Sequence, residues 1–275
     1  MIVFLHIPKT GGTSFRFILE NNFGLHHCHA GHAGEADFSE GDLAFTKKIF
    51  PGLRSVAGHN LVNPTRLPVA NPFYATILRE PVARVISHYL QIKRRRVPNI
   101  EFEKALRERQ ELENLHVKLM VGERNLDKAK FFLEKQCEFI GFTEKFDLSM
   151  RVFDRLTLGK LDVNYQRRRV SKESPFKKAV QADSRLLEMV KEFNRLDLEL
   201  YSFALNEVFP RLCEKAGLRA TDAVPPLDTY ASNFKSKYVL GRCFNRIIYR
   251  QLCKTRKTRE ANTMLFGARR EGLTD

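Results

Sequence analysis

The chain opens with an apolar run that passes directly into a glycine-rich turn. Residues 2–7 read IVFLHI, residues 8–14 read PKTGGTS, and the apolar residues of the following segment recur with helical spacing. This order predicts a buried strand, a tight loop and an amphipathic helix. A strand that turns directly into a helix brings backbone N–H groups and the positive end of the helix dipole to the turn. The turn is therefore a predicted anion site.

Each residue type in this turn suits a phosphate or a sulfate. Glycine lets the backbone approach an oxyanion closely, hydroxyl groups at the helix start add donors, and lysine supplies a mobile positive charge. The predicted anion-binding residues of the turn are Lys9, Thr10, Gly11, Gly12, Thr13 and Ser14. A turn that only connects a strand to a helix is the simpler alternative. The lysine precedes the glycines, unlike in the triphosphate loop G-x-x-x-x-G-K-[ST], which disfavours an ordinary kinase or GTPase.

The order of strand, turn and helix recurs along the chain. Further strands are predicted at residues 55–58, 73–78 and 139–142. Helical patterns cover residues 102–135 and 186–209, whereas residues 26–41 show no clear period and are predicted to be a loop or short irregular helices. Strands that alternate with helices predict an α/β fold with a mainly parallel central sheet flanked by helices.

A second cationic position follows the strand at residues 73–78. Arg79 ends that strand, and Ser87 lies about two helical turns inside the next helix, which starts at a proline. An anion beside this helix could meet both the guanidinium and the hydroxyl. An ion pair between Arg79 and the neighbouring Glu80 is the structural alternative. Taken with the first turn, the two motifs predict the halves of one nucleotide site.

The two motifs resemble those of the sulfotransferases that use 3'-phosphoadenosine-5'-phosphosulfate (PAPS). The sequence IPKTGGTS is similar to the 5'-phosphosulfate loop of the carbohydrate branch, and Arg79 with Ser87 is similar to the 3'-phosphate motif. A Gly-His pair at Gly58-His59 resembles the heparan 2-O-sulfotransferase group. Residues 139–149 and 197–203 extend the likeness to about residue 210.

This resemblance implies a P-loop-like nucleotide-binding sulfotransferase fold and a specific reaction. A sulfuryl group would pass from PAPS to an acceptor hydroxyl by direct in-line transfer, with release of 3',5'-ADP and without a metal. The acceptor implied by the branch is a glycan or a glycolipid. Related enzymes close a loop over the nucleotide where this chain has the basic run at residues 166–169, but the match there is too loose to assign.

Such a transfer requires a base for the hydroxyl proton and a positive group beside the leaving phosphate. His59 is the predicted base, because an unperturbed pKa of about 6.5 leaves it mostly neutral near pH 7. Lys9 is predicted to stabilise the leaving phosphate, with Ser14 as an auxiliary donor, and His6 to orient the loop. A structural histidine is the alternative for His59. Three carboxylates between the two motifs compete for the role of base, namely Glu35, Asp37 and Glu40.

Imidazole and thiol groups cluster after the first predicted helix. They belong to His26, His27, Cys28, His29 and His32. These are zinc-ligand types, but their spacing fits no standard site and no second ligand pair follows. We therefore predict no metal site, and expect a solvated loop or contacts with the acceptor. The five cysteines are odd in number and include no C-x-x-C pair, which disfavours a disulfide framework.

The formal net charge of +15 favours anionic partners. Basic residues concentrate near the C-terminus, so we divide the chain into a PAPS-binding domain at residues 1–230 and a basic extension at residues 231–275, helical or partly disordered. This extension could hold an acidic saccharide or an anionic membrane surface. No apolar stretch reaches membrane-spanning length, and we expect a cytoplasmic protein with peripheral membrane association as an option.

Two other functions fit parts of the sequence. A small magnesium-dependent kinase would also bind a nucleotide, although its carboxylate ligands cannot be placed. A non-enzymatic module that binds polyanions is supported by the net charge alone. Because no nucleic-acid-binding motif is present in the sequence, we expect no nucleic-acid partner.

Overall fold

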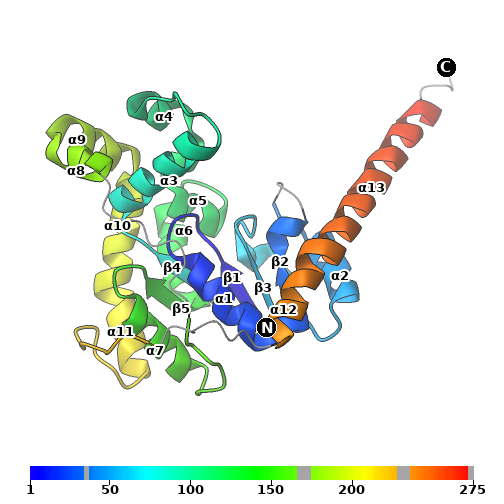
Figure 1. Cartoon of the computed structure of the whole chain (residues 1–275), viewed down its shortest axis with the longest axis horizontal. Helices are drawn as coiled ribbons and strands as arrows, with labels where there is room; N and C mark the ends of the chain where they lie inside the picture. Colours follow the sequence, from blue (N-terminus) through cyan, green and yellow to red (C-terminus); the bar gives the residue numbers. More distant parts are fainter. Residues whose placement is uncertain (34–36, 166–174, 228–235, 272–275) are drawn as a thin grey trace.

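The computed structural model describes residues 1–33, 37–165, 175–227 and 236–271. Five parallel strands form a sheet in the order β2-β3-β1-β4-β5 (Figure 1). The strands are β1 (Ile2–Leu5), β2 (His27–His29), β3 (Ser55–Gly58), β4 (Phe73–Leu78) and β5 (Cys137–Phe142). The predicted α/β class, with a parallel central sheet flanked by helices, is confirmed.

Helices follow every strand. Those before β5 are α1 (Gly12–Phe23), α2 (Glu40–Ile49), α3 (Pro81–Arg95), α4 (Phe102–Glu108), α5 (Leu115–Val121) and α6 (Leu126–Phe131). Those after β5 are α7 (Phe146–Leu156), α8 (Pro175–Ala182), α9 (Ser184–Phe193), α10 (Arg195–Phe203), α11 (Phe209–Lys215), α12 (Ser236–Cys243) and α13 (Arg250–Glu271). Short π-helical segments, η5 (Phe132–Gln136), η6 (Ala204–Val208) and η7 (Phe244–Tyr249), join neighbouring elements. The helix predicted at residues 186–209 is interrupted at Asn194.

Aromatic side chains hold the helices against the sheet. The ring of Phe15 in α1 lies 4.5 Å from that of Phe4 in β1 and 4.8 Å from that of Phe153 in α7. The ring of Phe139 in β5 stacks on that of Phe15 at 5.6 Å. Such pairs bury large apolar areas and prefer these tilted or offset geometries. The apolar strand at residues 2–5 is fully enclosed, as a central parallel strand requires.

The edge strand β2 occupies residues that the sequence analysis assigned to a loop or short irregular helices, and short 3₁₀ helices, η1 (Gly24–His26) and η2 (Ala30–His32), lie on either side of it. His27 and Cys28 are buried rather than solvated, and β2 pairs with β3 from His27 opposite Ser55 to His29 opposite Ala57. On its outer side, the amide of Asn245 accepts from the His29 N–H at 2.9 Å and donates to the His27 carbonyl at 2.8 Å. The strand was missed because it is three residues long, and its hydrogen-bond partners come from distant parts of the chain.

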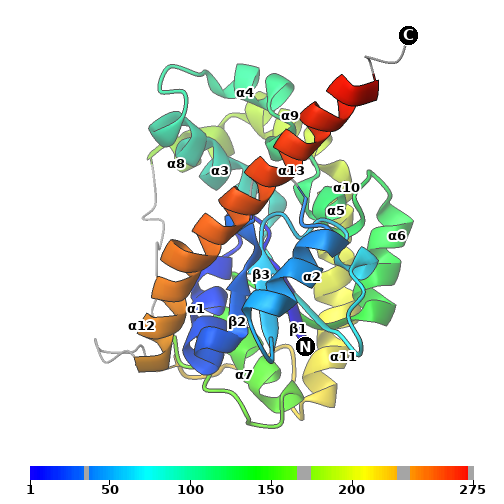
Figure 2. The same ribbon diagram turned by 90° about the vertical axis from the view of Figure 1, so that its right-hand side faces the viewer.

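The basic extension contributes to the same core. Residues 236–271 are helical, and Figures 1 and 2 place α12 and the start of α13 beside β2, with the rest of α13 running away from the body of the molecule. Tyr238, Tyr249 and Cys253 are buried in the hydrophobic core that also contains the sheet. The domain boundary near residue 230 stays a prediction.

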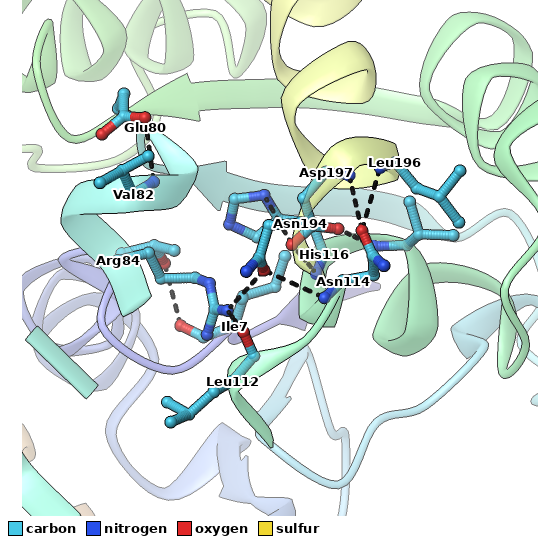
Figure 3. Close-up of polar contacts among 12 residues, drawn as sticks. Ile7, Glu80, Val82, Arg84, Leu112, Asn114, His116, Asn194, Leu196 and Asp197 are labelled. Atoms are coloured by element: carbon cyan, nitrogen blue, oxygen red, sulfur yellow. Dashed lines mark hydrogen bonds and ion pairs between the residues drawn. The ribbon is translucent and has the colours of Figure 1, made fainter. Parts of the chain in front are cut away.

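Two helix starts far apart in the sequence cap each other (Figure 3). The Oδ1 atom of Asn114, just before α5, accepts from the N–H groups of Leu196 at 3.0 Å and Asp197 at 3.2 Å in α10. In return, the Asp197 carboxylate accepts from the N–H groups of His116 at 2.9 Å and Val117 at 3.0 Å in α5. Because these first-turn N–H groups have no partner within their own helix, the exchange satisfies both termini.

The guanidinium of Arg84 ties α3 to this network. It is fully buried, and it donates to the carbonyl groups of Glu111 at 3.2 Å and Leu112 at 3.3 Å and to Oδ1 of Asn194 at 3.4 Å. Burial lowers the pKa of Arg84 to about 10, and the negative charge of Asp197 acts against this shift. Arg84 therefore stays charged at neutral pH and fixes α3 relative to α5 and α10.

Replacing Asp197 with alanine should strongly destabilise the protein. The change removes two capping bonds and leaves the Arg84 charge buried without its counter-charge, at a cost on the order of 3–5 kcal/mol of unfolding free energy. Urea unfolding measures this difference. The matched control is Glu199→Ala in the same helix, which breaks an exposed ion pair with Lys130 and should cost less than about 1 kcal/mol. Equal losses for the two variants would contradict the role of Asp197.

Candidate functional site

A cavity of about 550 Å³ lies at the carboxyl edge of the sheet. It is lined by residues that follow β1, β3, β4 and β5, and α3 contributes one wall. In parallel sheets, ligands bind at this edge where the strand order reverses, as it does beside β1 here. The predicted site residues that line the cavity are Lys9, Gly11, Gly12, Thr13, Ser14, His59, Arg79 and Ser87. Of the predicted site residues, Thr10 alone does not line the cavity.

The turn after β1 presents the start of α1 to this cavity. Lys9 and Gly11 have positive φ angles of 74° and 80°, so the backbone turns sharply in front of the helix. Helix α1 begins at Gly12 with no capping side chain and no acidic residue in its first turn. The residues at this helix start therefore supply no negative charge to the first-turn amides or to the positive end of the dipole, which suits the start of α1 to an anion. The ammonium group of Lys9 points at α3, donating to Oε1 of Gln91 at 3.2 Å.

Thr10 supports the turn from beneath. Its side chain is buried, and its hydroxyl donates to the carbonyl of Ile7 at 2.9 Å. The hydroxyl of Thr143, after β5, donates to the carbonyl of Thr10 at 2.7 Å and to that of Leu78 at 3.1 Å. These bonds fasten the turn to β4 and β5. The structure thus gives the Thr10 side chain a place under the turn, while the sequence analysis predicted a contact with the anion.

Gly12 is required by the imidazole beside it. A Cβ atom at this position would lie 2.1 Å from Cδ2 of His6, far inside van der Waals contact. The His6 ring is buried against the turn, where it also stacks on Phe4 at 5.5 Å. His6 therefore sets the position of the turn by packing against its glycine, which agrees with the orienting role predicted for it.

The His59 ring is held in one orientation with one nitrogen available. Its Nδ1 lies 2.5 Å from the carbonyl oxygen of His6. A carbonyl only accepts, so Nδ1 carries the proton and Nε2 of the neutral ring has a lone pair. The surrounding walls lower the pKa of His59 by desolvation, although the ring is exposed to solvent at the cavity; the carbonyl bond acts against this shift, and the charge of Arg16 adds to it. The ring lines the cavity and is neutral at pH 7, as proton acceptance requires.

Arg79 links the two predicted motifs. Its Nη1 donates to the carbonyl of Lys9 at 3.1 Å, which joins the end of β4 to the turn after β1. Glu80, the alternative partner for Arg79, instead caps α3 by accepting from the N–H groups of Val82 at 2.9 Å and Ala83 at 2.7 Å. Burial lowers the pKa of Arg79, while the charges of Glu144 and Glu80 act in the opposite direction.

The sequence analysis identified only Ser87 of the wall that α3 contributes to the cavity, and missed two further residues. Ser87, Gln91 and Arg95 all line the cavity. They are spaced four residues apart and therefore project from one face of the helix. This spacing was visible in the sequence, and extending it from Ser87 would have identified both further residues.

The opposite wall follows β5, where the sequence analysis named no site residue. Its cavity-lining residues include Phe146, whose ring contacts that of Tyr165 edge-on at 4.7 Å. The Tyr165 hydroxyl donates to Oδ1 of Asp147 at 2.8 Å. Nothing in the local pattern distinguished these aromatic side chains from core residues, because the cavity forms only when β5 lies beside β4.

Two of the three carboxylates that compete for the role of base do not line this cavity. Asp37 and Glu40 are not among its lining residues, and Glu35 and the basic run at residues 166–169 lie outside the described residues. Within the described ranges, no group of three or more His, Cys, Asp or Glu side chains could hold a metal ion. In the histidine cluster, burial lowers the pKa of His27 to about 3, and its Nδ1 shares a hydrogen bond with the Ser55 hydroxyl at 2.7 Å. His27 is therefore structural.

Comparisons with known proteins found a distant structural similarity. No protein-family model matches the sequence, and neither does any curated protein. Among solved structures, the crystal structure of a sulfotransferase from Alicyclobacillus acidocaldarius is similar with a TM-score of 0.37 and 14% identity, covering 72% of this chain and 97% of that one. A likeness this distant does not define a family.

The contact between Gly12 and His6 predicts a coupled pair. Gly12→Ala should lower the unfolding free energy by about 1–3 kcal/mol, because the new methyl group displaces the imidazole. In a His6→Ala background the methyl group has room, so the same change should cost less than half as much. Urea unfolding of the two single variants and the double variant measures this coupling. Gly217→Ala, with nothing within 4 Å of the new Cβ, is the control that should be independent of His6. Additive losses for Gly12 and His6 would contradict the contact.

Proposed function

We propose that this chain is a PAPS-dependent sulfotransferase that acts on a hydroxyl of a glycan or glycolipid. One observation carries the proposal: the PKTGGTS turn, the Arg79–Ser87 pair and His59 converge on a single cavity, with a hydrogen bond from Arg79 to the Lys9 carbonyl joining the two anion motifs. A volume of about 550 Å³ is within the usual range for pockets that bind molecules of nucleotide size.

The residues present fit a nucleotide that carries anionic groups at two positions. The uncapped start of α1, together with Lys9 and Ser14, would hold the 5'-phosphosulfate. Arg79 and Ser87 would hold the 3'-phosphate, and the nearby Arg95 adds positive charge to the same wall. The edge-on aromatic pair of Phe146 and Tyr165 offers a surface for a nucleobase. When bound, PAPS supplies an activated sulfuryl group whose donor leaves as 3',5'-ADP.

His59 acts as the base in this reaction, and Lys9 stabilises the leaving phosphate. Nε2 of His59 accepts the proton of the acceptor hydroxyl, while the bond from Nδ1 to the His6 carbonyl keeps the ring in place and stabilises its charged form. The ammonium of Lys9, positioned by Gln91, offsets the negative charge that develops on the leaving phosphate. The hydroxyl of Ser14, which also lines the cavity, would donate to the same oxygens.

The carboxylates of the cavity favour this reaction over a magnesium-dependent phosphoryl transfer. Glu144 accepts from the Glu80 N–H at 3.0 Å and from the Tyr201 hydroxyl at 3.1 Å. Asp147 accepts from the Tyr165 hydroxyl at 2.8 Å and from the Leu227 N–H at 3.1 Å. A kinase needs carboxylates that are directed at its magnesium ions. Among the residues that the structure describes, the two acidic side chains that line this cavity instead bond to the protein around it.

The cofactor is tested by titration calorimetry without added magnesium. We expect micromolar binding of 3',5'-ADP and much weaker binding of ADP and ATP. Arg79→Ala should raise the dissociation constant of 3',5'-ADP by about 10- to 100-fold, because it removes a charge-assisted contact to a phosphate. Arg66→Ala, at an exposed arginine away from the cavity, is the matched control. Preference for ATP with magnesium, or binding of heparin without any nucleotide binding, would reject the sulfotransferase.

The base is tested by substitution and by pH. His59→Ala should reduce kcat by about 10²- to 10⁴-fold and leave 3',5'-ADP binding within about twofold of the unmodified protein. His26→Ala, at an exposed histidine outside the cavity, should change neither quantity. Because the pKa of His59 is lowered, its ring becomes protonated only as the pH falls through that lowered value.

The acid limb of kcat/KM should therefore lie below about pH 6.5, with no loss of activity between that pH and neutrality. These measurements use release of 3',5'-ADP with an acceptor found by screening glycans and glycolipids. An active His59→Ala enzyme, or an acid limb above pH 6.5, would move the role of base to another residue.

A further inference from the structure

Exposed apolar side chains concentrate on one stretch of the C-terminal helices. Of the eight large hydrophobic side chains that are exposed among the described residues, five lie between residues 239 and 252: Val239, Leu240, Ile247, Ile248 and Leu252. Ile247 is 68% exposed and Leu240 60%. A sixth, Leu25, belongs to η1 (Gly24–His26), the short helix that α12 contacts. Apolar side chains gathered in this way mark an interaction surface.

The sequence of this stretch has a repeat of four residues and four faces, which are a buried face, an apolar flank, a basic flank and an outermost face that contains Val239 and Ile247. Tyr238, Asn245, Tyr249 and Cys253 are buried. The apolar flank consists of Leu240, Phe244, Ile248 and Leu252, and the basic flank of Arg242, Arg246, Arg250 and Lys254. In an α-helix a four-residue repeat drifts by about 40° at each step. The wider turn of the π-helical segment η7 (Phe244–Tyr249) works against this drift, so both flanks stay aligned along the helix.

The buried face fixes the helix so that its apolar flank cannot turn inward. Gly241 lies so close to Gly24 that an added Cβ would be 2.4 Å from the Gly24 backbone. Asn245 is bonded to β2 on both sides of its amide, and the Tyr249 hydroxyl shares a 2.7 Å hydrogen bond with that of Thr46 in α2. The exposure of the apolar side chains is therefore a property of the packed helix.

The charge beside the apolar flank indicates what covers it. Arg246, Arg250 and Lys254 are all exposed, and the whole chain carries a formal net charge of +15. A second copy of the chain would bring like charges together at such a surface, whereas anionic lipid headgroups would be attracted to it. Apolar side chains next to basic ones on a helix are the pattern that lies in a membrane interface. Within the described part of the chain, no helix has the length and apolar content to cross a bilayer.

We propose that α12, η7 and the start of α13 dock on an anionic phospholipid membrane. Ile247, Leu240 and their apolar neighbours enter the headgroup region, and Arg246, Arg250 and Lys254 contact lipid phosphates and carboxylates. This surface lies outside the residues that line the cavity, so the proposal is independent of the reaction catalysed there.

The chain contains no tryptophan, which gives a direct probe of insertion. Ile247→Trp would carry the only indole, and its emission should shift to the blue with vesicles of phosphatidylcholine and phosphatidylserine but not with phosphatidylcholine alone. Leu158→Trp is the matched control, since Leu158 is 76% exposed and lies after α7, away from this surface. Its emission should not move with either vesicle. An unshifted Ile247→Trp spectrum with the anionic vesicles would overturn the proposal.

Vesicle flotation with the unmodified chain and its variants separates the two flanks. Ile247→Gln/Ile248→Gln should lose on the order of tenfold in partitioning onto the anionic vesicles, while Leu158→Gln should not. Arg246→Gln/Arg250→Gln should lose a comparable factor, while Lys104→Gln/Arg107→Gln on α4 should not. All of these positions are exposed, and urea unfolding verifies that each variant folds.

Two results would assign the surface to a different partner. Binding to heparin without binding to vesicles, unaffected by Ile247→Gln/Ile248→Gln, would make it a purely electrostatic polyanion surface. A concentration-dependent dimer in analytical ultracentrifugation, abolished by the same double variant and without vesicle binding, would make it an interface between copies of the chain. Either result overturns membrane docking.

Discussion

The buried positive charge of Arg84 is the constraint on which both the fold and the site depend. A guanidinium without access to water requires acceptors in fixed positions, and these come from the segment before α5 and from Asn194 before α10. Helix α3 is thereby held at one angle to its neighbours. The same helix carries Ser87, Gln91 and Arg95 along the cavity. Arg84, which does not itself line the cavity, thus fixes the position of the cavity wall that α3 forms.

The parts of the structure that could be predicted are those encoded within a few neighbouring residues. The run at residues 2–7 is apolar throughout, as a strand buried on both faces must be, and it leads directly into glycines, hydroxyls and a lysine. The strand before Arg79 and the proline that starts α3 were equally clear. The two motifs were also predicted to form one site, and both line the same cavity, because parallel strands end at one edge of a sheet.

The parts that could not be predicted depend on contacts between distant segments. Thr10 has the residue type of an anion donor, yet its hydroxyl donates to the carbonyl of Ile7, and Thr143 fastens the turn from β5 by donating to the carbonyl of Thr10. Phe146 and Tyr165 read as core residues until β5 places them beside the cavity. The break between α9 and α10 at Asn194 also involves distant segments. The Asn194 side chain accepts hydrogen bonds from the Arg84 guanidinium and from the N–H of Asn114.

The side chain of Asn245 has a consequence for solubility. An edge strand presents unpaired backbone groups that can recruit a strand from another molecule. Along β2, the Asn245 amide meets the His27 carbonyl and the His29 N–H in the way that one residue of a neighbouring parallel strand would. It occupies the position that an invading chain would need. The helical segment that carries Asn245 therefore covers the edge of the sheet and protects the folded protein against edge-to-edge aggregation.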